Sequence, residues 1–164
     1  MRLDTNGTPA SKDPQSSHWS LRGIKQRDMK DKLTCGVHHV GLTVPDLEQA
    51  RSFFCDLLGF DEVGGDPDYP SIFVSDGRSL LMLWRAAVPT EAHPFDRRAN
   101  IGLHHLSLAV TDDAALDASW EKVRDHADVV IDVPPGPIRL GAATRHFLVF
   151  GPGGIRIEFA TPFV

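Results

Sequence analysis

The sequence predicts an α+β fold built from two copies of one βαβββ unit. The stretch Val37–Val44, which reads Val-His-His-Val-Gly-Leu-Thr-Val, returns 66 positions later as Leu103–Val110, Leu-His-His-Leu-Ser-Leu-Ala-Val. A second stretch, Ile72–Trp84, returns 75 positions later as Phe147–Phe159, with strand-like residues matched to strand-like residues. Two internal matches in the same order indicate a duplicated structural unit.

The first copy starts with the strand at 37–44, which is rich in β-branched residues and alternates in polarity. Asp46 and Gln49 then fit a helix N-cap and capping box. Apolar residues at helical spacing follow and predict an amphipathic helix of about three turns that stops at Gly59. Three short strands are expected next, near 60–64, 71–75 and 80–85, the last two joined by a turn at Asp76-Gly77.

The second copy repeats these elements from Leu103 onward. A helix capped near Thr111–Asp113 should turn Leu116, Trp120 and Val123 inward. Strands are expected around 129–133, 146–150 and 155–160, with a strong turn signal at 151–154. Because the offset between the copies grows from 66 to 75, we expect an insertion at 134–145, whose Gly and Pro content suits a lid.

The domain organisation follows from these repeats. Residues 1–32 are polar and lack apolar periodicity, which predicts a flexible N-terminal arm. The domain itself is expected over 33–164, with module one at 36–86, a linker at 87–101 and module two at 102–162.

Composition limits the partners and the compartment. The chain has 164 residues and a formal net charge of −5, so it lacks the basic footprint of a nucleic-acid-binding protein. Its two cysteines fall far short of a disulfide framework and favour a reducing compartment. No apolar run approaches the ~18–20 residues of a membrane span, and no signal peptide is indicated. We therefore expect a cytoplasmic protein with neither nucleic-acid nor membrane partners.

Strand geometry selects one histidine from each pair. Successive side chains of a strand point to opposite faces, and the apolar set Val40, Leu42 and Val44 suits the face covered by the helix. The other face then carries smaller and more polar side chains: His39, Gly41 and Thr43 in the first copy, and His105, Ser107 and Ala109 in the second. His39 and His105 are therefore the candidates for a functional role.

The last strand supplies a third candidate. Its alternation places Glu158 and Arg156 on the face opposite the apolar side chains, and a carboxylate in mid-strand is costly to bury alone. Glu158 becomes reasonable if it binds a cation, and it also fits as a surface charge or as a partner of Arg156. Together with His39 and His105 it would make a two-histidine, one-carboxylate metal site with open coordination positions.

Four motifs carry a resemblance to a known family. They are His-His-Val-Gly-Leu-Thr-Val-Pro-Asp-Leu, Phe-Phe-Cys-Asp-Leu-Leu-Gly-Phe, His-His-Leu-Ser-Leu-Ala-Val and Gly-Pro-Gly-Gly-Ile-Arg-Ile-Glu-Phe. Over residues 36–162 the chain resembles the vicinal oxygen chelate superfamily, which includes glyoxalase I, bleomycin- and fosfomycin-resistance proteins, methylmalonyl-CoA epimerase and extradiol dioxygenases. The resemblance implies that the two modules form a cupped eight-stranded mixed sheet around one metal, with the helices outside.

The resemblance also carries the metal ligands onto His39, His105 and Glu158. The fourth ligand of glyoxalase I falls on Leu83, which argues against glyoxalase I activity and favours an extradiol-dioxygenase-like oxidoreductase. Fe(II) is then the expected metal, with Mn, Zn and Ni as alternatives. A lyase or isomerase of the glyoxalase or epimerase type is the second interpretation, and a non-catalytic drug-binding resistance protein is the third.

Three more residues are candidates for substrate chemistry. Arg156 shares a face with Glu158 and would pair with an anionic group of a small-molecule substrate or with Glu158 itself. His146 and Tyr69 are the candidate acid–base groups at the rim of the site. The resemblance implies a homodimer and leaves open whether the site lies within one chain or is shared between chains.

Overall fold

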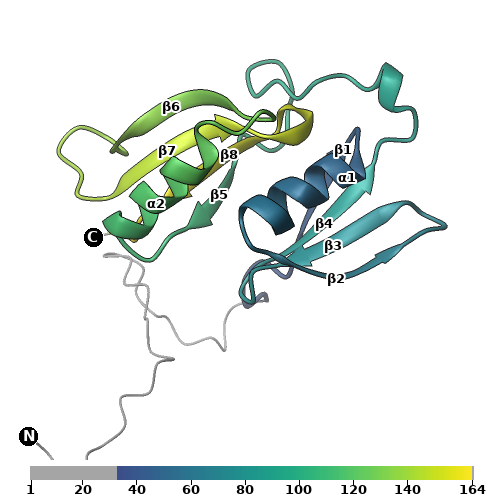
Figure 1. Cartoon of the computed structure of the whole chain (residues 1–164), viewed down its shortest axis with the longest axis horizontal. Coiled ribbons are helices and arrows are strands. Elements are labelled where there is room, and N and C mark those ends of the chain that lie inside the picture. Colours follow the sequence, from purple (N-terminus) through teal and green to yellow (C-terminus); the bar gives the residue numbers. More distant parts are fainter. Residues whose placement is uncertain (1–32, 164) are drawn as a thin grey trace, which may run out of the picture.

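The computed structural model describes residues 33–163, so the predicted arm at 1–32 lies outside the described residues. The chain forms two four-stranded sheets with the strand orders β1-β4-β3-β2 and β5-β8-β7-β6 (Figure 1). Module one contains β1 (Val40–Val44), β2 (Asp61–Asp66), β3 (Ser71–Ser75) and β4 (Leu80–Arg85), and module two contains β5 (Leu106–Ala109), β6 (Val130–Pro137), β7 (Arg145–Phe150) and β8 (Arg156–Ala160). The same strand order in both sheets confirms the predicted duplication.

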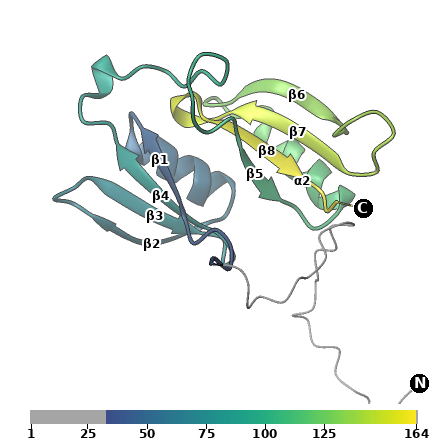
Figure 2. The ribbon, with the colours of Figure 1, turned by 180° about the vertical axis from the view of Figure 1, so that it is seen from behind.

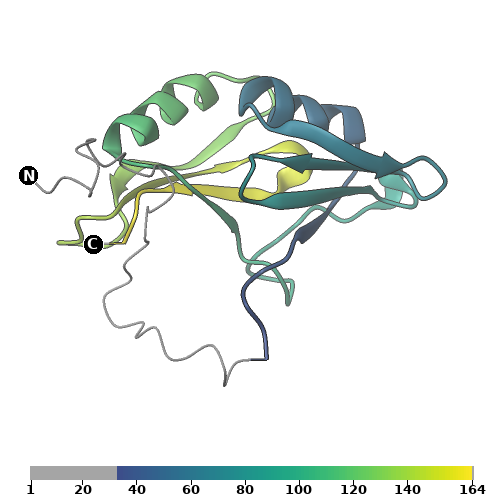
Figure 3. The same ribbon diagram turned by 90° about the horizontal axis from the view of Figure 1, so that it is seen from below.

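Each sheet is mixed, because its first strand runs parallel to its last and the other pairs are antiparallel. One helix follows the first strand of each module: α1 (Leu47–Arg51) in module one and α2 (Asp113–Val123) in module two. Both helices lie on the same side of the two sheets (Figure 3). The predicted α+β fold of two βαβββ units is confirmed, and the open sheets are consistent with a cupped arrangement.

Both predicted helix caps are present. Asp46 accepts a hydrogen bond from the backbone N–H of Gln49 at 3.0 Å, and Asp112 accepts one from Ala115 at 2.8 Å. The Gln49 side chain does not return to its cap but donates to Asp128 of module two at 2.8 Å. Among the described residues no helix is long and apolar enough to cross a bilayer.

The first helix departs from the expected regular α-helix. After Arg51 the chain continues as a π-helix over Ser52–Leu57. Phe53 and Phe54 are adjacent and both fully buried, with their rings perpendicular at a centroid distance of 5.2 Å. A π-helical segment has a wider turn than an α-helix, and this widening accompanies the burial of two consecutive aromatic rings.

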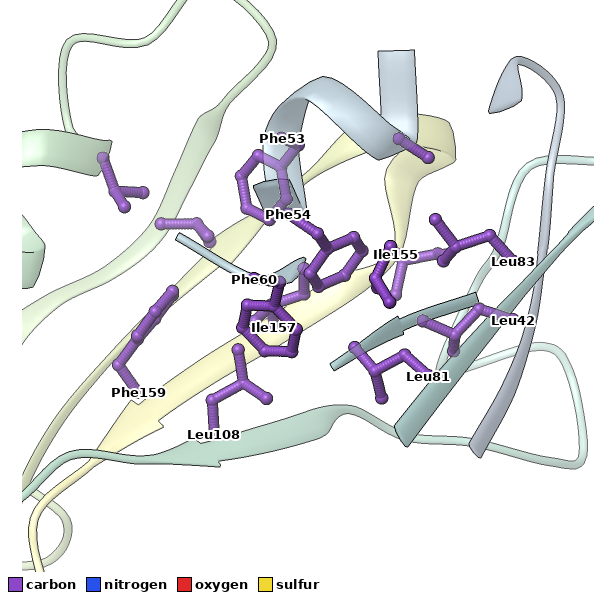
Figure 4. Close-up of a cluster of buried hydrophobic side chains, with 14 of the residues drawn as sticks. Leu42, Phe53, Phe54, Phe60, Leu81, Leu83, Leu108, Ile155, Ile157 and Phe159 are labelled. Carbon is purple, nitrogen blue, oxygen red and sulfur yellow. The ribbon is translucent and has the colours of Figure 1, made fainter. Parts of the chain in front are cut away.

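One hydrophobic core joins the two modules beneath the helices (Figure 4). Its buried members include Leu42, Phe53, Phe54, Leu81 and Leu83 from module one and Leu108, Leu116, Phe147, Ile157 and Phe159 from module two. At Gly151 a Cβ atom would lie 3.1 Å from Cδ1 of Ile157 and 3.5 Å from Cζ of Phe53. The close packing at this glycine fixes the helical segment of module one against the sheet of module two.

The strand pairing corrects one correspondence between the copies. Ser107 pairs with Glu158, and its equivalent Gly41 pairs with Met82. The counterpart of Glu158 is therefore Met82 and not Leu83, which is fully buried in the core. The reason is one extra residue in the turn before β8, because a shift of one residue moves a side chain to the opposite face of a sheet.

The insertion predicted at 134–145 is partly strand. β6 runs to Pro137, and its register against β7 shifts twice, between Ile131 and Val133 and between Val133 and Gly136. These irregularities accommodate the extra residues within the sheet edge. The remaining loop is short, and the backbone N–H of Ile138 closes it by donating to the carbonyl of Thr144 at 2.9 Å.

Candidate functional site

We call the side of each sheet that faces away from the helices its open face. On the open face of module two, Ser107 of β5, Glu158 of β8 and Leu148 of β7 form one row. His146 of β7 lies in the next row, opposite Ala160. Glu158 is only 6% exposed, so the carboxylate predicted to need a partner is indeed buried.

Each oxygen of the Glu158 carboxylate meets one imidazole. Nδ1 of His146 lies 2.5 Å from Oε1, and Nε2 of His105 lies 3.2 Å from Oε2. The carboxylate can only accept, so the N–H of His146 donates a hydrogen bond to it, whereas His105 approaches the other oxygen as an ion-pair partner. This arrangement brings together two candidates of the predicted ligand set, His105 and Glu158, with the predicted acid–base residue His146. We call these three residues the Glu158 group.

The ionisation of Glu158 reflects two opposing effects. Burial by itself raises the pKa of Glu158, because a buried carboxylate loses its hydration. Hydrogen bonds from His146 and Ser107 and the nearby imidazoles favour the charged form, and the net result is a pKa below the usual glutamate value. Glu158 is therefore a carboxylate at neutral pH and acts as a fixed negative charge in the sheet.

The predicted histidine pairs are in contact within each pair. Nδ1 of His104 lies 2.8 Å from Nδ1 of His105, and Nδ1 of His38 lies 2.9 Å from Nδ1 of His39. His105 is thus engaged at both ring nitrogens, by His104 on one side and Glu158 on the other. Partial desolvation lowers the pKa of His104, and the positive charges of Arg156, His105 and Arg97 lower it further.

Arg156 pairs with a residue that sequence patterns did not single out. Its Nε and Nη2 atoms lie 2.7 Å and 2.6 Å from Oδ2 of Asp132 on β6. Of the two alternatives for Arg156, an anionic substrate group or Glu158, the structure shows no pairing with Glu158. The missed signal was an Asp between Ile131 and Val133 in a predicted strand, which raises the same question of burial cost as Glu158 does.

The remaining two candidates lie elsewhere. Tyr69 is 68% exposed, and its ring packs against Trp84 of module one with centroids 5.0 Å apart. His39 is exposed just before β1, beside His38. Neither residue hydrogen-bonds to the Glu158 group, so the structure does not bring them into that group.

The sequence pattern of the glyoxalase/bleomycin resistance protein/dioxygenase superfamily matches residues 36–159, which cover module one, nearly all of module two and the whole Glu158 group. The chain belongs to this superfamily. The predicted resemblance to the vicinal oxygen chelate proteins is therefore confirmed.

Relatives within the superfamily differ in length and in named activity. The chain is 29% identical over 143 residues to a 2-epi-5-epi-valiolone epimerase from Actinomyces sp., a match that covers 74% of this chain and 76% of the epimerase. It is 30% identical over 108 residues to a catechol-2,3-dioxygenase from Bacillus subtilis (strain 168), which covers 63% of this chain and only 36% of the dioxygenase.

The fold is also found among solved structures. A glyoxylase/bleomycin resistance protein/dioxygenase domain from Frankia sp. EAN1pec superposes with a TM-score of 0.64 at 24% identity, covering 79% of this chain and 93% of that one. At this identity the likeness supports the shared fold.

Divalent metals are common in the superfamily. We therefore asked whether the side chains near Glu158 could bind such an ion. Two imidazoles and a carboxylate are suitable ligands for such an ion. Among residues 33–163, however, no group of three His, Cys, Asp or Glu side chains is placed to hold a metal ion. His105 and Glu158 lie together, but His39 is not with them, so the three predicted ligands do not form a metal site within one chain.

A cavity of about 690 Å³ lies apart from the Glu158 group. It is lined by residues 41–45, by the linker and by the turn at Gly153. Figure 2 shows the course of the linker that connects β4 to β5. The lining of the cavity is mostly apolar, with His93 and Asn100 as the polar contributors from the linker. No residue of the Glu158 group lines this cavity, so the Glu158 group and the cavity are separate features.

Proposed function

We propose that this member of the superfamily is an enzyme that moves a proton on a small substrate with vicinal oxygens, as an epimerase or isomerase does. The observation that carries the proposal is the buried carboxylate of Glu158 between two imidazoles. A negative charge that accepts from an imidazole fixes which ring nitrogen carries hydrogen and makes the other a base. The match to most of the epimerase from Actinomyces sp. also supports this reaction class.

His146 is the residue best suited to act as the base. Its Nδ1–H donates to Oε1 of Glu158, which leaves the lone pair of Nε2 free to accept a proton. Removing a proton from the carbon beside a carbonyl leaves an electron pair that moves onto the carbonyl oxygen and gives an enediolate. Return of a proton from solvent to the other face of that carbon inverts it, and the proton taken by His146 is released to solvent, so no oxidant is consumed.

His105 has a supporting role in this proposal. With Nε2 on Glu158 and Nδ1 against His104, it links the buried carboxylate to an exposed imidazole. A chain of hydrogen-bonding groups of this kind can carry a proton between the site and solvent. We therefore assign His105 to proton exchange and to the orientation of Glu158.

Exchange of hydrogen for deuterium tests the reaction. Small α-hydroxyketones, which carry vicinal oxygens, are incubated with the protein in D2O, and loss of the proton signal beside the carbonyl is followed by NMR. The wild type should catalyse exchange, and His146→Gln should lower the rate by about 10²–10⁴-fold, the usual contribution of a general base. Equal rates for the wild type and His146→Gln would exclude His146 as the base.

We also propose a divalent metal as cofactor, with His39, His105 and Glu158 as ligands and Fe(II) first among Fe, Mn, Zn and Ni. Binding of the ion would take the place of the contact between Nε2 of His105 and Glu158, with loss of the Nε2 proton. Such an ion would polarise the substrate oxygens when bound. Because His39 lies apart from the other two ligands in one chain, we propose that His39 of a second copy completes the set. The proposed homodimer would then contain two shared sites.

Mixing two inactive variants tests this sharing. His39→Ala and Glu158→Gln are each purified, unfolded together and refolded as mixed dimers, and bound iron, zinc, manganese and nickel are measured. Shared sites restore one intact site in each mixed dimer, whereas a site within one chain leaves every site short of a ligand. Restored metal content supports the shared site, and its absence contradicts it.

A dioxygenase is the second candidate, favoured by the match to the catechol-2,3-dioxygenase of Bacillus subtilis. The chain spans little more than a third of that enzyme's length, which is why we place it after the epimerase. Uptake of oxygen on addition of catechol to iron-loaded protein would support the dioxygenase. Deuterium exchange without oxygen uptake would support the epimerase.

A further inference from the structure

Three charged side chains from distant parts of the chain meet beside the Glu158 group. Arg156 of β8 binds Oδ2 of Asp132 on β6, as described above. Arg97 of the linker approaches the other oxygen, Oδ1, at 3.9 Å. Its guanidinium carbon also lies 5.9 Å from the centroid of the Phe150 ring on β7. The linker is thus placed against the sheet of module two by an arginine.

The charges of this cluster do not balance. Two guanidinium groups face one carboxylate, and the side chains of Arg97, Asp132 and Arg156 are only 21%, 17% and 8% exposed. Partly desolvated positive charge in excess favours a bound anion. The cluster of Arg97, Asp132 and Arg156 therefore has a net positive charge that one more negative group would neutralise.

The two arginines differ in how their donors are used. Arg156 directs both Nε and Nη2 at one carboxylate oxygen. Arg97 is 3.9 Å from its oxygen, which is longer than a hydrogen bond, so its guanidinium donors are not committed to Asp132. A planar guanidinium with uncommitted donors can bind a carboxylate or a phosphate through two parallel hydrogen bonds.

We propose that Arg97, supported by Arg156, forms a subsite for an anionic group of the substrate, a carboxylate or a phosphate. Arg156 and Glu158 lie two residues apart on one face of β8, about 7 Å along the strand. The anion subsite would thus lie on the same face of the sheet as Glu158, at the end of β8 away from His146, which pairs with Ala160. The assignment of the anion to a substrate rests on the proposed function, whereas the anion site itself does not.

The neighbouring carboxylates do not neutralise Arg97 in the described part of the chain. Asp96, next to it in sequence, is exposed and accepts a hydrogen bond from the backbone N–H of Arg98 at 2.8 Å. Glu158 has each oxygen directed at an imidazole. Among residues 33–163, Asp132 is the one acidic side chain that forms an ion pair with Arg97.

Binding of inorganic phosphate tests the subsite without any turnover. Isothermal titration at constant ionic strength, with a chelator present, compares the wild type with Arg97→Ala and with Arg98→Ala, which removes a neighbouring exposed arginine. We expect Arg97→Ala to raise the Kd for phosphate about tenfold and Arg98→Ala to leave it within about twofold. Arg97→Lys keeps the charge without the planar fork and should fall between them.

Asp132→Asn should act in the opposite direction. It removes the carboxylate that competes for both guanidinium groups, so phosphate should bind about threefold more tightly. Equal Kd values for Arg97→Ala and Arg98→Ala, or no phosphate binding by the wild type, would overturn the subsite. If phosphate binds as expected but deuterium exchange fails, the proposed reaction is wrong and the anion site stands.

Discussion

The two modules share one fold and differ in what their open faces carry. Where module two has Glu158, the paired position of module one is Met82, and where module two has His146, module one has Ser71. Both modules carry a histidine pair, but the carboxylate of Glu158 and the imidazole of His146 are confined to module two. Duplication of a fold does not duplicate a site, because single positions on the open face decide the chemistry.

Module one carries aromatic side chains instead. The ring centroid of Trp84 lies 5.8 Å from that of Phe73 and 5.0 Å from that of Tyr69. The equivalent of Trp84 in module two is Ala160, next to His146. Large rings thus occupy the open face of module one, where module two has a small residue beside the imidazole. One half therefore offers an apolar surface and the other a buried charge.

The largest effect should come from introducing a carboxylate into β4 of module one, on the core face or on the open face. Leu83→Glu places an unpaired charge in the core and should lower the free energy of unfolding by about 4 kcal/mol or more. Met82→Glu places the same side chain on the open face, at the true counterpart of Glu158, and should cost about 1–2 kcal/mol. Urea denaturation measures both.

The reverse order of these two variants would contradict the register of β4. It would mean that Leu83 faces the open side, as a simple 75-residue shift suggests. The two substitutions differ by one position on one strand, so each serves as the control of the other.

The pH dependence of stability should follow Glu158 of module two. Its pKa is lowered on folding, so its contribution is complete above the usual glutamate pKa and is lost as the pH falls through the lowered folded value. In EDTA, the wild type should lose more unfolding free energy than Glu158→Gln as the pH is lowered from about 5 to about 3. Parallel curves for the two proteins would show that Glu158 is not stabilised as a carboxylate.

The smallest effect concerns the counterpart of His146. Within the described residues, Oγ of Ser71 is buried without a hydrogen-bond partner. Ser71→Ala should therefore raise the free energy of unfolding by up to about 1 kcal/mol. Ser75→Ala on the same strand is the control, because Oγ of Ser75 accepts from the N–H of Gly77 at 3.0 Å and its loss should be destabilising. A loss of stability in Ser71→Ala would contradict the unpaired hydroxyl.

The sequence predicted best those features that depend only on neighbouring residues, through periodicity or local hydrogen bonding. The repeat predicted both modules, alternation predicted the face of Glu158, and the caps at Asp46 and Asp112 follow from local hydrogen bonding. The partner of Arg156 could not be predicted, because Asp132 reaches it across two strands whose register contains bulges.

The placement of His39 shows a second limit. Strand parity assigns its face but not the distance between two sheets, which depends on packing at residues such as Phe53 and Gly151. The same packing decides where the linker lies and hence that Arg97 approaches Asp132. These long-range relations follow from the folded core, not from any local pattern.

The most direct test of the contrast between the modules compares Glu158→Gln with Met82→Leu in the deuterium exchange of α-hydroxyketones. We expect Glu158→Gln to lose about 10²–10⁴-fold in exchange rate, because His146 loses the charge that orients it, and Met82→Leu to remain within about threefold of the wild type. Equal losses in the two variants, or full activity in Glu158→Gln, would contradict the assignment of the chemistry to module two.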